Sequence, residues 1–238
     1  MEKSSGSKYR HEYKYICDAM EMAVLCTRIR TLMSRDSHCD ENGNYQIRSL
    51  YFDDFEDRCY YENESGIGER DKYRIRIYNA DREIIHLEKK SKNRGMTMKK
   101  TCSIDEDICR CLMRGIRPKI QSMFSEDLRV MLQEMEQRCL RPVVIVEYIR
   151  EPFVCQNGNT RITFDKNIRS SNEIDNFLEK DISARPIMEK GKGILEVKWD
   201  EFLPDYIAGQ LQLDSLQWSS FSKYYLCRRY NNYGGLRV

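Results

Sequence analysis

Basic and apolar side chains alternate along residues 71–78 (DKYRIRIY). This alternation limits the possible folds of the chain more than any other feature of its sequence. Lys72, Arg74 and Arg76 occupy every second position, and tyrosine or isoleucine fills each position between them. Successive side chains of a β-strand point to opposite faces of its sheet. The segment is therefore predicted to be a strand with one basic face and one apolar face.

The same alternation returns in four other segments. In RHEYKY, near the N-terminus, Arg10, Glu12 and Lys14 share one face. In IIHLEKK the polar face carries His86, Glu88 and Lys90. In TRITFD it carries Arg161, Thr163 and Asp165, and in ILEVKW it carries Glu196 and Lys198. On these faces Arg and Lys outnumber Asp and Glu, whereas a solubilising surface usually mixes the two signs freely.

Eight segments are predicted to be strands because they are rich in branched and aromatic residues and end at turn residues. They are Tyr9–Cys17, Tyr45–Asp53, Asp71–Tyr78, Glu83–Lys90, Thr97–Ile104, Pro142–Arg150, Thr160–Asp165 and Gly193–Trp199. The predicted helices are Asp18–Ser34, Phe55–Asn63, Asp105–Arg114, Ile120–Arg138, Pro204–Leu213 and Phe221–Tyr230. Short turns favour antiparallel pairing, and eight strands suffice to close a barrel. The predicted fold is α+β, an eight-stranded antiparallel β-tunnel with inserted and C-terminal helices, forming one domain over residues 9–230 after a flexible tail, residues 1–8.

The charged faces have two interpretations. In an ordinary half-solvated sheet they would face water, and for any single strand this is the commoner arrangement. If the apolar faces instead pack on the inserted helices, the basic faces line the interior of the barrel. Cations gathered there repel one another unless a polyanion fills the space. A phosphate chain suits such a site, because Arg and Lys form charge-assisted hydrogen bonds with it, and the few carboxylates suit a hard divalent metal.

Composition excludes several other classes of protein. The longest apolar run, residues 143–146, is far shorter than the roughly 20 residues of a membrane helix, and the start of the chain has no apolar signal core, so we expect a cytoplasmic protein. The ten cysteines are scattered and the three histidines lie far apart, which favours reduced thiols over disulfides or structural zinc. Because the aromatic side chains oppose the cations, a nucleic-acid binder is not expected.

Nine segments together resemble a known family. They are RHEYKY, IRSLYFD, KYRIRIY, HLEKKSK, TMKK, VVIVEYIREPF, TRITFD, ILEVKW and FSKYYLCRRY. Their order and spacing, from about Tyr9 to Tyr230, resemble the VTC-type polyphosphate polymerase domain, a branch of the CYTH or triphosphate tunnel superfamily. The resemblance implies an eight-stranded tunnel that transfers the γ-phosphate of ATP onto a growing polyphosphate chain, with ATP, pyrophosphate and polyphosphate as ligands.

The resemblance also implies roles for individual residues. The catalytic cations would be Arg74, Arg76, Lys90, Arg161 and Lys198. The substrate-binding residues would be Lys14, Lys99, Tyr148, Arg150 and Lys223, together with the interior acids Glu12 and Glu88, which either tune neighbouring cations or bind metal. Glu196 would hold Mn²⁺ or Mg²⁺. For Lys99 and Lys223 the assignment depends on the resemblance alone, whereas the strand faces support most of the others.

One departure from the superfamily pattern bears on the reaction. The hydrolytic tunnel enzymes begin with Glu-x-Glu-x-Lys, but here Arg10 precedes Glu12 and Lys14. Exchanging a metal-binding carboxylate for a cation favours a polymerase over a hydrolase. Lys92 stands where related polymerases tend to carry histidine. The alternatives are a triphosphatase that hydrolyses inorganic or nucleoside triphosphates, and a non-catalytic polyphosphate-binding module. A membrane channel, if one is used, is expected from a separate partner protein.

Overall fold

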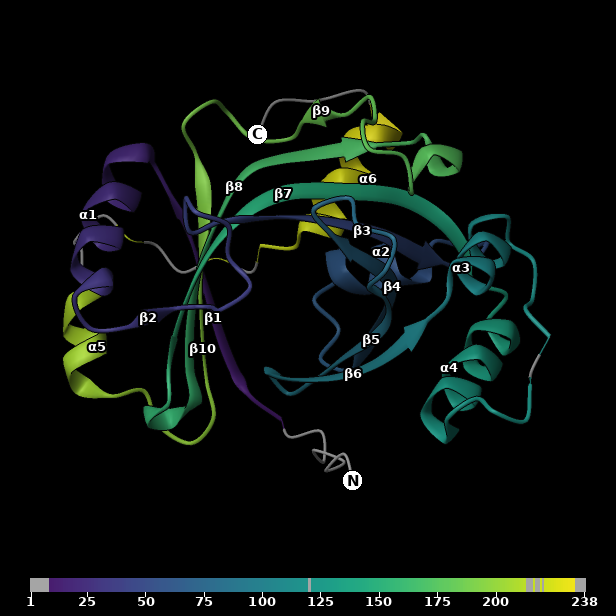
Figure 1. Cartoon of the computed structure of the whole chain (residues 1–238), viewed down its shortest axis with the longest axis horizontal. Helices are drawn as coiled ribbons and strands as arrows, with labels where there is room; N and C mark the ends of the chain where they lie inside the picture. The colour runs from purple at the N-terminus through teal and green to yellow at the C-terminus, as the bar shows by residue number, and fades with distance from the viewer. Residues whose placement is uncertain (1–8, 120, 213–215, 217–218, 220, 234–238) are drawn as a thin grey trace.

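The computed structural model describes residues 9–119, 121–212, 216, 219 and 221–233. Its strands are β1 (His11–Cys17), β2 (Ser34–Arg35), β3 (Tyr45–Asp53), β4 (Arg70–Tyr78), β5 (Ile85–Asn93), β6 (Met96–Ile104), β7 (Arg141–Cys155), β8 (Thr160–Ser171), β9 (Arg185–Pro186) and β10 (Gly193–Trp199). Its α-helices are α1 (Ala19–Arg30), α2 (Arg58–Glu64), α3 (Glu106–Met113), α4 (Glu126–Gln137), α5 (Asp205–Gln210) and α6 (Lys223–Tyr233), with 3₁₀ turns at Asn157–Asn159 and Ile174–Asn176. Figure 1 shows their arrangement.

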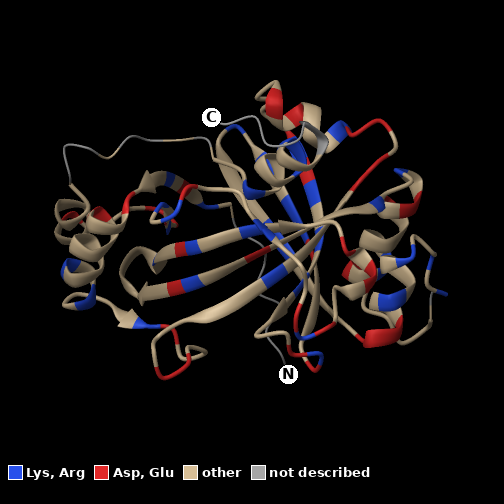
Figure 2. Ribbon diagram, turned by 90° about the horizontal axis from the view of Figure 1, so that it is seen from above, with Lys and Arg blue, Asp and Glu red and all other residues tan. Residues whose placement is uncertain are grey.

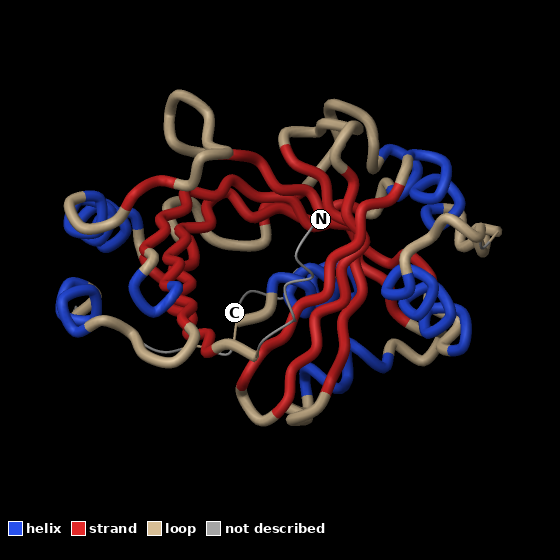
Figure 3. The backbone as a smooth tube through the Cα atoms, turned by 60° about the horizontal axis from the view of Figure 1, so that its bottom comes forward, coloured by secondary structure: helices blue, strands red, loops and turns tan. Residues whose placement is uncertain are grey.

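The strands form one strongly curled antiparallel sheet in the order β1-β10-β8-β7-β3-β4-β5-β6, with β2 and β9 as short additions on β7 and β8. In the described part of the chain, one isolated antiparallel bridge between Arg10 and Thr97 joins the two edges, β1 and β6. The amide of Arg10 donates to the carbonyl of Thr97 at 2.9 Å, and the reverse bond is 3.0 Å. The predicted eight-stranded tunnel is therefore confirmed, and Figure 3 shows how the sheet curls around its interior.

Helices cover the outer, apolar face of the sheet. Helices α1 and α5 pack on β7, β8 and β10 around Phe153, Phe164 and Leu195, all fully buried. Helices α3 and α4 pack on β4, β5 and β6 around Ile75 and Leu87. Removing one such side chain from a close-packed core typically costs about 2–5 kcal/mol. Because the helices take the apolar faces, the basic faces of the same strands are left to the inside, as the alternation predicts.

Capping side chains decide where the helices begin. Asp18 and Asp105 accept hydrogen bonds from backbone amides in the first turns of α1 and α3, at 2.8 and 2.7 Å. The fourth predicted helix was wrong over residues 121–124, which form no helix in the structure, since Ser125 caps α4.

Other predicted bounds differ from the structure at strand and helix ends. Strands β7 and β8 run well past their predicted ends, while β2 and β9 were missed because each contains only two residues. The expected tail over residues 1–8, Ile120 itself and the predicted helix end at Leu213 lie outside the described residues. The ten cysteines are all free. No described helix combines the length and the apolar character needed to span a membrane.

Helix α6 returns to the interior of the curled sheet. Its Tyr224 and Cys227 are buried against the inward residues of β3 and β7. The fully buried Asp53 accepts hydrogen bonds from the Tyr224 hydroxyl and, at 2.9 and 3.1 Å, from the amides of Cys59 and Tyr60 in α2. This carboxylate thus joins α2 to α6, and it fixes the start of α6 at the edge of the interior space.

Candidate active site

The interior of the sheet holds a cavity of about 650 Å³. Of the described residues, thirteen Lys and Arg side chains line it, against three acids, Glu12, Glu196 and Asp200. The cations are Arg10, Lys14, Arg70, Lys72, Arg74, Arg76, Lys90, Lys92, Lys99, Arg150, Arg161, Lys198 and Lys223. Arg10 directly precedes β1, and the others come from β1, β4, β5, β6, β7, β8, β10 and α6. Figure 2 shows Lys and Arg positions recurring along neighbouring strands.

The structure gathers the site residues expected from the sequence around this one cavity. All of them line it except Glu88, which is fully buried behind the wall. Their roles remain predictions. The sequence placed Lys72 on the basic face without giving it a site role, and it left out Arg70, which the two-residue period leading to Arg74 would have added. Arg70 was missed because the predicted strand began one residue too late.

On one wall, Glu88 of β5 binds three cations. It accepts from Arg74 Nε at 2.7 Å and Lys99 Nζ at 2.9 Å, and Arg76 Nη1 lies 3.6 Å away. Burial alone would raise the pKa of Glu88, but the surrounding cations hold it well below its ordinary value. Arg74 also donates to the Tyr51 hydroxyl at 2.7 Å. The buried carboxylate therefore fixes the position of cations that face the cavity.

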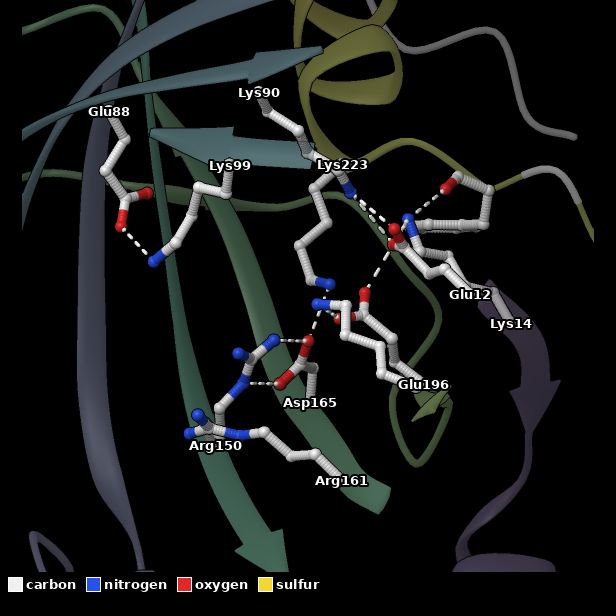
Figure 4. Close-up of polar contacts among 12 residues, drawn as sticks. Glu12, Lys14, Glu88, Lys90, Lys99, Arg150, Arg161, Asp165, Glu196 and Lys223 are labelled. Carbon is white, nitrogen blue, oxygen red and sulfur yellow. Dashed lines mark hydrogen bonds and ion pairs between the residues drawn. The ribbon is translucent and has the colours of Figure 1, made fainter. Parts of the chain in front are cut away.

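The opposite wall repeats this design with Asp165 of β8, which is also fully buried. It accepts from Arg150 Nε at 2.7 Å and Nη2 at 2.8 Å, and Lys223 Nζ of α6 is 2.6 Å away. Both cations lie over the ring of Tyr148, 5.4 and 4.8 Å from its centroid. Figure 4 shows this cluster beside Arg161. Arg161 donates to Tyr45, yet its buried Nε has no partner among the described residues.

Between the walls lies a network of Glu12, Lys14, Lys90, Glu196 and Lys198. In the antiparallel register of β1 and β10, Glu12 faces Lys198 and Lys14 faces Glu196. Lys14 Nζ is 2.8 Å from Glu12 and 3.6 Å from Glu196, Lys90 is 2.6 Å from Glu12, and Lys198 pairs with Glu196. Figure 4 shows Glu12, Lys14 and Glu196 side by side. The two glutamates thus share three lysines.

Burial and mutual repulsion set the charge of this network. Burial, reinforced by Lys14 and Lys198 and opposed by Glu12, lowers the pKa of Lys90 to about 7. Burial and the nearby Lys14, Lys90 and Arg70 likewise bring the pKa of Lys72 well below its ordinary value. Although burial opposes it, the lysines and Arg150 hold the pKa of Glu196 well below its usual range. The cavity therefore holds excess positive charge that an anion would relieve.

The sequence profile of one family, described as the VTC domain, matches residues 9–230. The chain belongs to the VTC domain family. The match spans the strands that build the cavity, from the residue before Arg10 to helix α6. A search of curated proteins found no significant match to the sequence.

Two solved structures share the curled sheet of this VTC domain. A candidate adenylate cyclase from Bacillus halodurans is 11% identical, with a TM-score of 0.51 over 87% of this chain and 88% of its own. A candidate adenylyl cyclase from Hippeastrum, for which a dominant triphosphatase activity is described, is 14% identical, with a TM-score of 0.55 over 96% and 97%. At such identities the likeness shows the fold alone, which is that of the triphosphate tunnel proteins.

The VTC domain offers a divalent metal two carboxylates rather than a complete cage. No group of three or more His, Cys, Asp or Glu residues is placed to hold a metal among the residues described. Glu12 and Glu196 line the cavity from adjacent strands. Although burial opposes it, nearby lysines lower the pKa of both carboxyl groups and so favour their charged form. Mg²⁺ and Mn²⁺ are hard ions, and Mg²⁺ commonly binds one or two carboxylates together with phosphate oxygens. The residues fit such an ion when a phosphate ligand supplies the remaining oxygens.

Binding of tripolyphosphate to the VTC domain is expected to take up a proton. In the free protein Lys90 is about half protonated near pH 7, and a bound polyanion raises its pKa because it favours the charged amine. Above pH 7 the complex then binds more protons than the free protein, so affinity should fall as pH rises, by up to about tenfold per pH unit. Calorimetry in buffers of different ionisation enthalpy measures the uptake.

Tripolyphosphate itself titrates, so the matched control is the Lys90→Met protein measured under the same conditions. We expect the wild type to take up roughly one proton more than this variant at pH 8. Equal uptake by the two proteins would contradict the assignment to Lys90.

Proposed function

We propose that this VTC domain is a metal-dependent polyphosphate polymerase that transfers the γ-phosphate of ATP onto an inorganic polyphosphate chain. The observation that supports it best is the cavity itself, which thirteen cations and three acids of the described chain line. A linear polyanion neutralises charges spread along such a cavity, which a compact monoanion would leave unpaired.

The chain's own residues have distinct parts in this mechanism. Arg74 and Arg76 on one wall and Arg150 on the other bind and orient phosphate oxygens, held in place by Glu88 and Asp165. Phosphoryl transfer has a loose transition state, so positioning and charge neutralisation supply most of the catalysis. Glu196, with Glu12 beside it, would hold Mn²⁺ or Mg²⁺. Bound there, the ion would supply positive charge that offsets the charge of the phosphoryl oxygens.

The proposed reaction needs no strong general base, because the terminal phosphate of the acceptor chain is already an anion. His86 is the histidine on the inward face of β5, opposite Arg76, and burial lowers its pKa. Its Nδ1 is buried and has no hydrogen-bond partner in the described chain. We assign it no part in proton transfer, and the chemistry is left to the cations and the metal.

A triphosphatase is the second candidate, because the Hippeastrum relative of the same fold is described with that activity. Against it stands Arg10, which occupies the position of the first motif glutamate and pairs with Asp200 at 2.6 Å. Incubation with ATP and Mn²⁺ separates the two. We expect long polyphosphate on a gel, whereas release of orthophosphate without polymer would identify a hydrolase. Binding of polyphosphate with neither product would identify a binding module.

Replacing Arg74 with alanine should weaken tripolyphosphate binding with or without metal. The side chain contacts both Glu88 and the cavity, and truncating a buried, hydrogen-bonded charge typically costs about 2 kcal/mol or more, which is roughly thirtyfold in affinity. Isothermal titration calorimetry measures the change. Arg117→Ala, which removes a half-exposed arginine that pairs with Glu136 of α4 and does not line the cavity, is the matched control and should leave affinity unchanged. Equal affinities of all three proteins would remove Arg74 from the binding site.

A further inference from the structure

The curled sheet has one weak junction. Seven neighbouring strand pairs are joined over five to ten residue pairs each. By contrast, β1 and β6 meet in the described chain through the bridge of Arg10 and Thr97 and its two backbone hydrogen bonds. We call this junction the β1–β6 seam. In Figure 1 the lower end of β1 approaches the tip of the β5–β6 hairpin there.

Side chains add little to the seam. The guanidinium of Arg10 does not contact β6 in these interactions: it pairs with Asp200 and donates to the carbonyl of Asn159. Inside the cavity, the ion pair between Glu12 of β1 and Lys90 of β5, at 2.6 Å, spans the seam. Lys90 is also one of the cations available to a phosphate chain. A phosphate group that binds Lys90 therefore competes with Glu12 and loosens the seam.

The path by which a polymer enters decides which polymers can bind. Both Arg10 and Thr97 line the cavity, so separating them would open the cavity at the edge where β1 and β6 meet. A closed tunnel accepts a linear chain only by threading one free end. An opening side wall accepts any internal segment, whatever is attached to the ends.

We propose that the β1–β6 seam opens and admits phosphate polymers from the side, so that the cavity binds internal segments of long polyphosphates as well as their ends. This inference rests on the proposed function, because it takes the cavity to be the polyphosphate site. It adds a class of ligand, polyphosphate whose two ends are blocked, that end-on threading excludes.

The test uses a long linear polyphosphate whose terminal phosphates carry biotin through phosphoramidate links, capped at both ends with streptavidin. Wild-type protein should bind this blocked polymer about as tightly as the uncapped one. Tripolyphosphate, measured in parallel, separates two failures. If it does not bind, the proposed function fails. If it binds and the blocked polymer does not, side entry alone is overturned.

A disulfide across the seam gives the second arm. Arg10 and Thr97 are register partners whose Cα atoms in such a hydrogen-bonded pair lie about 5.5 Å apart, within the range of a disulfide. The oxidised and reduced forms of the Arg10→Cys/Thr97→Cys protein should bind tripolyphosphate equally, whereas the oxidised form should bind the blocked polymer at least about tenfold more weakly than the reduced form. Wild-type protein treated with the oxidant controls for the native cysteines. Equal binding of blocked polymer by the oxidised and reduced forms would overturn the proposal.

Amide hydrogen exchange on the wild type needs no variant. The amides of Arg10 and Thr97 should exchange at least about a hundredfold faster than those of Tyr13 and Leu87, which lie inside long strand pairings. Equal protection of all four would mean that the seam does not open separately from the sheet, and would overturn side entry even if the disulfide does not form.

Discussion

Replacing Glu196 with glutamine is expected to lower metal-dependent polymer synthesis about a hundredfold or more, because the change removes the charge that a hard cation requires while keeping the shape. Metal-free binding of tripolyphosphate should survive or tighten. In the wild type Glu196 neutralises Lys198 and, at 3.6 Å, Lys14. The glutamine variant frees Lys198 for phosphate and leaves Lys14 with Glu12 as its remaining partner in this network. Chain synthesis from ATP and Mn²⁺ and metal-free calorimetry measure the two effects.

The opposite signs of these effects make the assignment testable. Glu56→Gln is the matched control, since it removes a carboxylate that is 79% exposed, precedes α2 and does not line the cavity. That variant should behave as wild type in both assays. Near-normal synthesis by the Glu196→Gln protein would rule out the metal assignment. Loss of metal-free binding by that protein would instead identify Glu196 as a structural residue.

Replacing Glu88 with glutamine should be the most destabilising of the charge-removing changes, at about 3–5 kcal/mol. Glu88 is fully buried and neutralises Arg74, Arg76 and Lys99, so the variant leaves three cations together without their anion. A bound polyanion supplies the missing charge. Tripolyphosphate should therefore raise the free energy of unfolding of the variant by more than it raises that of the wild type.

Urea unfolding with and without tripolyphosphate measures both parts of this prediction. The control is Glu106→Gln, whose carboxylate pairs with Arg110 on the surface of α3 and should contribute less than about 1 kcal/mol. A loss below 1 kcal/mol in the Glu88 variant would show that the three cations do not depend on this carboxylate. If tripolyphosphate stabilises the variant and the wild type equally, the three cations do not share a site with the ligand.

The sequence predicted the faces of the strands because their signal is purely local. Alternation at Arg74 and Arg76, or at Glu196 and Lys198, requires only that the segment be a strand and that helices take the apolar side. The same rule also placed Lys72 on this face and would have added Arg70, had the predicted strand begun one residue earlier. It could not place Glu88 behind the wall rather than on it, because the depth of a side chain depends on the cations that close over it from β4 and β6.

Other parts of the site depend on contacts between distant segments. The pairing of Lys223 with Asp165 joins residues far apart in the chain, and it requires α6 to enter the interior, which no periodicity reports. Asp53 joins α2 to Tyr224 of α6, a role that depends on segments distant in the chain and that no local pattern indicates. The β1–β6 seam is likewise a property of how the sheet curls, since residues 9–17 and 97–104 both have ordinary strand patterns.

The central claim is that the cavity binds a chain of phosphates, and metal-free calorimetry with tripolyphosphate at low ionic strength tests it most directly. We predict one tripolyphosphate bound per chain, with an affinity that falls as salt is added but falls less than it would for exposed lysines, because buried charges are screened less. A folded protein that gives no detectable binding at low salt would contradict the claim.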